Sequence, residues 1–296
     1  MTNAPPLRVW LYSAALLAGV IGLCMLLRHM PGPRYDNTIA SQTQTFLATP
    51  SSGEKLRVLA LGSSLLRAAT PEVASVQRAA MPDIAWMRMT KGGGGMGYLQ
   101  ASLATLVSRP PDVLILEQNL LLPDDGNMAM DELREDAWHF AKQTVSLLTA
   151  GKFSSPPPYW ERNDQELAFT CGPEQRTFSV AQMRQHAVSL QDLYRQSTFD
   201  AALISNVAAL AQRGVRVVLL DVRRSLLMEQ LTAQQKEDWQ RRLHALLPAS
   251  RNIIYLTSPA FTRQNLYCDG SHLNAQGARL FGPWWQSQLQ QLRNRA

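Results

Sequence analysis

Metal-binding patterns are absent from this sequence of 296 residues. It contains three cysteines, Cys24, Cys171 and Cys268, and no CxxC pair or cysteine–histidine spacing of the kind that holds zinc. We therefore expect no metal site and no cofactor. The sequence leaves two states open for Cys171 and Cys268: a disulfide, if the body of the chain lies in an oxidising compartment, or two free thiols.

Clustered positive charge is also missing. The net charge is +6 and the pI is about 9.5, so the protein is mildly basic. Its lysines and arginines are scattered, and no basic stripe with interleaved aromatic side chains occurs. This distribution argues against a nucleic-acid partner.

One long stretch near the N-terminus lacks charge altogether. Residues 9–27 are apolar or weakly polar, and a helix of that length nearly crosses the core of a bilayer. Trp10 and Tyr12 stand at one end, where interfacial aromatic residues belong, and no small-residue cleavage site follows. The pattern predicts an uncleaved membrane anchor over residues 1–30 and a Pro-, Ser- and Thr-rich linker over residues 31–55.

The remaining chain, residues 56–296, alternates short apolar runs with helical patterns. Strands are predicted at 57–62, 84–89, 112–117, 215–221 and 252–256. Helices are predicted near 71–80, from the glycine run to about 107, at 128–150, from Ser179 as far as Arg213, at 230–247 and at 275–292, with an irregular insertion at 151–178. Strands that are apolar throughout indicate a doubly wound (flavodoxin-like) parallel sheet of five strands.

Polar residues gather where these predicted strands end. Gly62-Ser63-Ser64 follows the first strand, a glycine run at 92–95 follows the second, and Glu117-Gln118-Asn119 follows the third. Asp269 and His272 come after the fifth. Because ligands of open α/β sheets bind beyond the carboxyl ends of the strands, we expect these groups to form one site.

These residue types suit nucleophilic catalysis by serine. A serine hydroxyl needs a base, a group that orients the base, and donors for the oxyanion. Ser64 is the candidate nucleophile, with Ser63 as the alternative. His272 is the candidate base, Asp269 its orienting acid, and the Asn119 side chain an oxyanion donor.

Taken together, the four blocks resemble the SGNH (GDSL-type) hydrolase superfamily. Gly62-Ser63-Ser64 matches its first block, residues 92–95 its second, Glu117-Gln118-Asn119 its third and Asp269-Gly270-Ser271-His272 its last, over about residues 56–293. The resemblance implies an oxyanion hole made by backbone N–H groups of Ser64 and of a glycine, Gly93 or Gly94, together with the Asn119 amide.

The sequence departs from the family pattern at two positions. Ser63 replaces the usual Asp, as it also does in membrane-anchored members that move acyl groups onto cell-envelope polymers. Glu117 replaces the usual Gly, which puts an acid beside the oxyanion hole, where it would weaken the hole or bind substrate. Arg223 and Arg224, after the fourth strand, are further candidates for binding a carboxylate or an anionic glycan.

The resemblance implies a membrane-anchored enzyme that transfers or removes an O-acyl group, acetyl foremost, on a cell-envelope polysaccharide. Its expected partners are the glycan acceptor and a membrane-bound O-acyltransferase. Arg8 lies on one side of the predicted anchor and Arg28 and Arg34 on the other, so these charges do not decide its orientation. The resemblance favours a single-pass protein of the inner membrane with its catalytic domain on the periplasmic side.

Two hypotheses from other classes stay open. The body could be a non-catalytic scaffold that holds a polysaccharide or a membrane partner. Alternatively, Gly92-x-Gly94-x-x-Gly97 fits a dinucleotide-binding fingerprint, with Glu117 as the ribose-binding acid of an NAD-dependent oxidoreductase. That alternative leaves Ser64, Asn119 and the Asp269–His272 pair unexplained.

Overall fold

The computed structural model describes residues 6–29, 56–70, 81–91, 93–106, 110–123 and 179–294. The chain divides into two units, Met1–Asp36 with Ala129–Pro156, and Asn37–Met128 with Pro157–Ala296. Each unit is described by itself. The linker at 31–55, the helices expected at 71–80 and 128–150 and the insertion at 151–178 lie outside the described residues.

The membrane span predicted over residues 9–27 is not borne out. The segment does form a helix, α1 (Leu7–His29). Within the described ranges, however, no helix combines the length and the apolar character that crossing a membrane requires.

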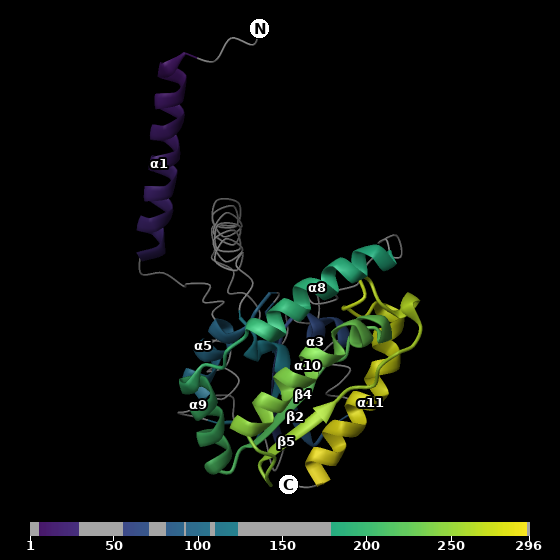
Figure 1. The fold of residues 1–296 in the computed structure, drawn as a ribbon. Coiled ribbons are helices and arrows are strands. Elements are labelled where there is room, and N and C mark those ends of the chain that lie inside the picture. Colours follow the sequence, from purple (N-terminus) through teal and green to yellow (C-terminus); the bar gives the residue numbers. More distant parts are fainter. Residues whose placement is uncertain are drawn as a thin grey trace. The chain divides into compact units, whose positions relative to one another are not determined.

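The second unit is built on the predicted five-stranded parallel sheet, which is confirmed (Figure 1). Its strands are β1 (Leu56–Gly62), β2 (Ile84–Thr90), β3 (Val113–Glu117), β4 (Arg216–Asp221) and β5 (Ile253–Thr257). Their spatial order is β2-β1-β3-β4-β5, and every neighbouring pair is parallel. This is the flavodoxin-like order, in which the connections reverse direction between β1 and β3.

The described helices of this unit are α3 (Ser64–Ala69), α5 (Met96–Leu106), α8 (Val180–Gln196), α9 (Ala201–Gln212), α10 (Leu226–Leu246) and α11 (Ala275–Asn294), with 3₁₀ turns η1 (Gln118–Leu121) and η2 (Gln264–Leu266). Five of them, α3, α8, α9, α10 and α11, begin at a serine, aspartate or asparagine whose side chain accepts a backbone N–H. The predicted helix start at Ser179 is confirmed, and Ser179 and Gln182 form a capping box there. Asn274 accepts backbone hydrogen bonds at the start of α11.

One predicted helix is wrong in its length. The segment from Ser179 to Arg213 forms two helices, α8 and α9. Ser197 ends α8 with its N–H and its hydroxyl both donating to Leu193 O. Asp200 then starts α9 by accepting a hydrogen bond from Leu203 N–H at 2.8 Å, so the two caps enforce a break that apolar periodicity does not reveal.

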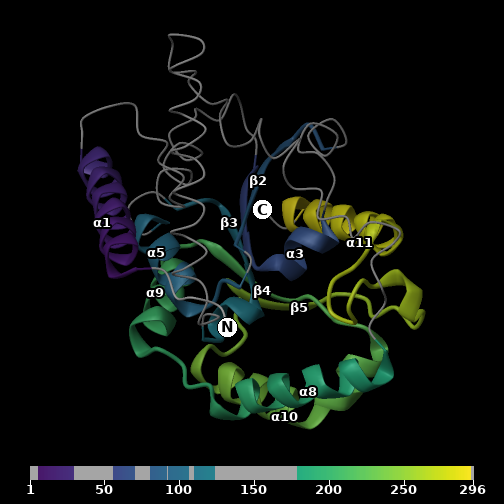
Figure 2. The same ribbon diagram turned by 90° about the horizontal axis from the view of Figure 1, so that it is seen from above.

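Both faces of the sheet are covered by helices (Figure 2). Along β1, Leu59 and Leu61 belong to a core shared with α5, α8, α9 and α10. Val58 and Ala60, which point to the opposite face, belong to a core shared with α3 and α11. All four residues are fully buried, which explains why the strands read as continuous apolar runs.

A buried charged cluster lies against the end of β4. Lys236 of α10 forms ion pairs with Asp221 at 2.8 Å and Glu229 at 2.7 Å, and its side chain is 8% exposed. Burial alone would lower the pKa of Lys236, but Asp221, Tyr194 and Glu229 raise it. The cluster therefore keeps its charges inside the protein because opposite charges meet there.

Replacing Lys236 with Met should destabilise the protein strongly. The buried carboxylate of Asp221 and the half-buried one of Glu229 would lose their shared cation, a change that typically costs about 3–5 kcal/mol. Arg241 of the same helix offers a control, because its pair with Asp238 is exposed and should contribute less than about 1 kcal/mol. Urea unfolding measures both. Equal losses for K236M and R241M would contradict this account.

Candidate functional site

A continuous chain of hydrogen bonds joins Ser64, His272 and Asp269. The Ser64 hydroxyl, at the start of α3, lies 2.8 Å from His272 Nε2. His272 Nδ1 lies 2.7 Å from Asp269 Oδ2. The structure thus brings together the three residues that the sequence proposed as nucleophile, base and orienting acid, although Ser64 and His272 are 208 positions apart in the chain.

The hydrogen bond to Asp269 selects the tautomer of His272. Burial alone would raise the pKa of Asp269, but hydrogen bonds and charge from His272, with the Ser271 N–H, lower it to about 2. The other carboxylate oxygen accepts the N–H groups of Ser271 at 2.9 Å and His272 at 2.8 Å. An ionised Asp269 can only accept, so His272 Nδ1 donates to it, and in the neutral tautomer with this proton Nε2 is the acceptor that faces the Ser64 hydroxyl.

Gly270 allows the loop to turn between the acid and the histidine. Its φ is +83°, in the left-handed region, and an added Cβ would lie 3.0 Å from Met183 Sδ and 3.2 Å from Met228. Its carbonyl accepts the Ser225 N–H at 2.9 Å, which ties the loop to the start of α10. The loop is therefore held from α8 and α10 at once.

Cys268 adds a covalent restraint to the same loop. Its sulfur is disulfide-bonded, and its N–H donates to His272 O at 2.8 Å. Cys171, the partner expected from the sequence, lies outside the described residues. The disulfide begins one residue before Asp269, so it limits how far the acid can move.

Glu117, at the end of β3, occupies the space beneath the turn between β1 and α3. Its side chain is fully buried, and it accepts hydrogen bonds from the Ser63 N–H and the Ser63 hydroxyl, each at 2.7 Å. It also accepts from Leu66 N–H at 3.2 Å and from Asn119 Nδ2 at 2.9 Å. The suggestion that Glu117 binds substrate is therefore wrong, because burial closes its carboxylate to any ligand.

The predicted oxyanion donors differ in whether they already donate to another group of the protein. No described residue accepts a hydrogen bond from the Ser64 N–H, whereas Ser63, Leu65 and Leu66 all donate theirs. Asn119 Nδ2 donates one hydrogen to Glu117, and no other described residue accepts a hydrogen bond from it. Two donors thus remain open beside the nucleophile, Ser64 N–H and the Asn119 amide.

The glycine turn after β2 contributes less than expected. The Gly94 N–H donates to Lys91 O at 3.2 Å, so the prediction of Gly94 as an oxyanion donor is wrong. Gly93 is exposed with a φ of 67°, and no acceptor for its N–H lies in the described part of the chain. Gly95 packs against Leu122 O, which places the turn next to the segment that carries Asn119.

Of the two arginines after β4, Arg224 is not a surface group. It is 7% exposed, and its guanidinium donates to the Tyr194 hydroxyl at 3.1 Å. Burial would lower the pKa of Arg224, but Tyr194, Glu229 and Asp221 raise it. Its expected role in binding an anionic substrate is thus not supported. Arg223 is exposed, and its role stays a prediction.

Sequence reasoning missed His186 as a neighbour of the site. Burial lowers the pKa of His186, the charge of Arg224 lowers it further, Asp269 raises it, and His272 lowers it. His186 lies on α8, whose Met183 borders the Gly270 position in the loop that carries the acid and the base. The available signal was its spacing from Met183 and Leu190, which puts it beside the buried stripe of α8.

The dinucleotide alternative does not fit this geometry. Glu117 is enclosed, so it cannot meet a ribose, and the glycine run follows β2, an edge strand. Ligands of such sheets bind at the reversal between β1 and β3, where Ser64 and Asn119 lie.

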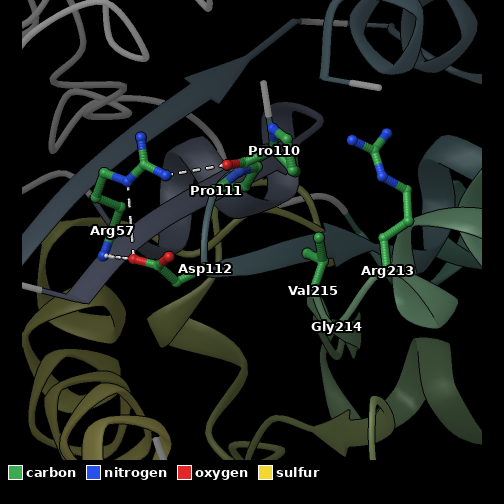
Figure 3. Close-up of a pocket in the computed structure, with 7 residues that line it drawn as sticks. All are labelled: Arg57, Pro110, Pro111, Asp112, Arg213, Gly214 and Val215. Atoms are coloured by element: carbon green, nitrogen blue, oxygen red, sulfur yellow. Dashed lines mark hydrogen bonds and ion pairs between the residues drawn. The ribbon is translucent and has the colours of Figure 1, made fainter. Parts of the chain in front are cut away.

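A pocket of about 390 Å³ lies at the amino ends of the strands (Figure 3). It is lined by Arg57, near the start of β1, and by the segments that precede β3 and β4; Arg57 pairs there with Asp112. Strand direction separates this pocket from the triad, because the triad lies at the carboxyl ends of the parallel strands. The pocket contains no residue predicted for the site.

Comparisons with known proteins give little guidance. No family model matches the chain, and no curated protein matches it. Among solved structures, an active-site mutant of a family two carbohydrate esterase from Clostridium thermocellum, in complex with "celluohexase", is similar at 8% identity with a TM-score of 0.35. The match covers 83% of this chain and 66% of the esterase, a likeness too distant to assign an activity.

Replacing Gly270 with Ala should disturb the triad. Both a positive φ and contact with Met183 oppose the new Cβ. Gly214 provides the control, because its φ is +92° and open space surrounds its Cβ position. We expect the downfield proton resonance of the His272–Asp269 hydrogen bond to be lost in G270A and kept in G214A. An unchanged resonance in G270A would contradict the assigned role of this glycine.

Proposed function

We propose that this protein is a serine acyl enzyme in which Ser64 carries the acyl group. The observation that supports it most is the hydrogen-bonded chain from the Ser64 hydroxyl through His272 to Asp269. Such a chain supplies the nucleophile, the base and the orienting acid of serine catalysis, and its members come from separate ends of the unit.

In the first half of the reaction, Ser64 Oγ attacks the carbonyl carbon of an ester while its proton passes to His272 Nε2. Asp269 stabilises the resulting imidazolium. The Ser64 N–H and the Asn119 amide donate to the oxyanion of the tetrahedral intermediate. The intermediate then collapses, the C–O bond to the alcohol breaks, and the alcohol leaves with the proton from His272.

In the second half, an acceptor hydroxyl attacks the acyl-Ser64 ester. His272 removes the proton of that hydroxyl and returns it to Ser64 Oγ when the acyl bond breaks. Water as acceptor gives hydrolysis, and a sugar hydroxyl gives transfer. Both reactions use the same residues, so the acceptor alone decides between esterase and acyltransferase.

For the substrate we propose an O-acylated polysaccharide of the cell envelope, with acetyl as the acyl group. Support comes from the four sequence blocks at strand ends, which resemble enzymes of that chemistry. For transfer, a membrane-bound O-acyltransferase would supply the acyl group. The disulfide at Cys268 favours an oxidising compartment outside the cytoplasm, the periplasmic side in the proposed setting.

The proposal predicts that turnover of a small acetyl ester requires Ser64. We expect p-nitrophenyl acetate hydrolysis to vanish in the Ser64→Ala variant, since it removes the hydroxyl that lies 2.8 Å from His272 Nε2. Ser63→Ala tests the alternative nucleophile and should still form the acyl adduct on Ser64. When an acetylated oligosaccharide and an unmodified one are both supplied, acetylation of the unmodified one indicates transfer, and free acetate indicates hydrolysis. Full activity of S64A would refute the mechanism.

The proposed compartment predicts that Cys268 resists alkylation in whole cells. Maleimide should modify it only after the cells are treated with reductant, because a disulfide has no thiol to react. A Cys268→Ser variant shows which band of the mass-shift gel belongs to this residue. Modification of Cys268 without reductant would contradict an oxidising location.

A further inference from the structure

Glu117 is an unusual group for the interior of a sheet. Its carboxylate is completely buried, and no described residue forms an ion pair with it. Four donors surround it instead: two backbone N–H groups, one hydroxyl and one amide. A carboxylate has about four acceptor positions, so every one of them is filled. Burying a carboxylate costs free energy unless hydrogen bonds compensate it, as these four do.

The four hydrogen bonds connect the two halves of the oxyanion hole. Oε2 accepts the N–H groups of Ser63 and Leu66, which flank Ser64 in the chain. Oε1 accepts the Ser63 hydroxyl and Asn119 Nδ2. The carboxylate therefore fixes the backbone that presents the Ser64 N–H, and the same group fixes the Asn119 amide.

We propose that Glu117 is a positioning residue that orients both donors of the oxyanion hole, an inference that rests on the proposed serine acyl chemistry. It touches neither the nucleophile's oxygen nor the substrate, and it acts through Ser63 and Asn119. One hydrogen of Asn119 Nδ2 is bound to Glu117, which leaves the other for the oxyanion. Without that acceptor the amide could flip and present its carbonyl oxygen, which would repel an oxyanion.

The two departures from the SGNH pattern, at Ser63 and Glu117, lie in direct contact. Their side chains meet at 2.7 Å, and a Cβ on Gly62 would lie 2.9 Å from Glu117 Oε2. An acid at position 63 would reach the same space from the other side. The structure thus indicates one exchange, in which the acid expected on the first block is supplied by the third.

The first test is the isosteric variant Glu117→Gln. Glutamine has one oxygen and one NH2 group, so it cannot accept from four donors. The N–H groups of Ser63 and Leu66 cannot turn away, so the glutamine oxygen should face them and its NH2 should face Asn119. The Asn119 amide then flips. We expect kcat for p-nitrophenyl acetate to fall about ten-fold or more with little change in KM.

A buried acid at the neighbouring strand end gives the matched control. Asp221 ends β4 and pairs with Lys236, so Asp221→Asn should lower the unfolding midpoint but keep kcat. If E117Q retains the kcat of the parent protein, the positioning role is overturned. A higher kcat would overturn it too, since it would mean that the negative charge opposes the oxyanion.

A double-mutant cycle shows whether Glu117 acts through Asn119. Asn119→Ala removes the amide, so adding E117Q should cost kcat much less in that background than in the parent protein. A purely structural role would instead give losses that multiply. Full multiplication of the two effects contradicts the inference.

Two further measurements cover other failures. If E117Q does not fold, the double variant Ser63→Asp with Glu117→Gly should fold and have a higher kcat than E117G, because it returns an acid to the same space. A kcat no higher than that of E117G overturns the exchange.

If the parent protein shows no Ser64-dependent turnover, the proposed function fails. The Asn119 side-chain NMR resonances then decide: a shift in E117Q but not D221N supports positioning, and no shift overturns it.

Discussion

The parallel pairing of β1 with β3 is the constraint on which the site depends. In this register Leu61 lies opposite Leu116, so the next residues along, Gly62 and Glu117, end the two strands side by side. Gly62 has no side chain, and this leaves the room that the Glu117 carboxylate fills. The turn that carries Ser64 and the turn that carries Asn119 are consequently joined through one buried group.

His272, the candidate base, comes to the Ser64 turn from the C-terminal end of the unit. Gly270 turns the loop, Asn274 starts α11, and α11 packs with α3 on the same face of the sheet. The loop also contacts Met183 and Met228, on helices that cover the opposite face. His272 is therefore held by elements from both layers, which keeps its Nε2 within hydrogen-bond distance of Ser64.

Much of this architecture could be predicted from the sequence, because buried parallel strands have continuous apolar sequences. The strand ends then placed Ser64, Asn119, Asp269 and His272 at one edge. Side-chain direction could not be predicted in the same way. Neither the burial of Arg224 nor the enclosure of Glu117 follows from a position at a strand end, because a polar side chain there can turn into the interior when hydrogen-bond partners are present.

Local capping explains two other differences. The break between α8 and α9 depends on Ser197 and Asp200, whose hydrogen bonds outweigh a continuous apolar stripe. The short helix α3 begins at Ser64 because Ser63 caps it, a contact that became visible only with the partners of its hydroxyl. At each of these helix ends a polar side chain determines where the helix begins or ends.

Covalent labelling by a fluorophosphonate tests the central claim most directly. Such a reagent requires an activated serine with open oxyanion donors, and peptide mass spectrometry locates the labelled residue. This account predicts that the intact protein is labelled on Ser64, and that His272→Ala, which removes the base, abolishes the reaction. Labelling elsewhere, or none on Ser64 in the folded protein, would contradict it.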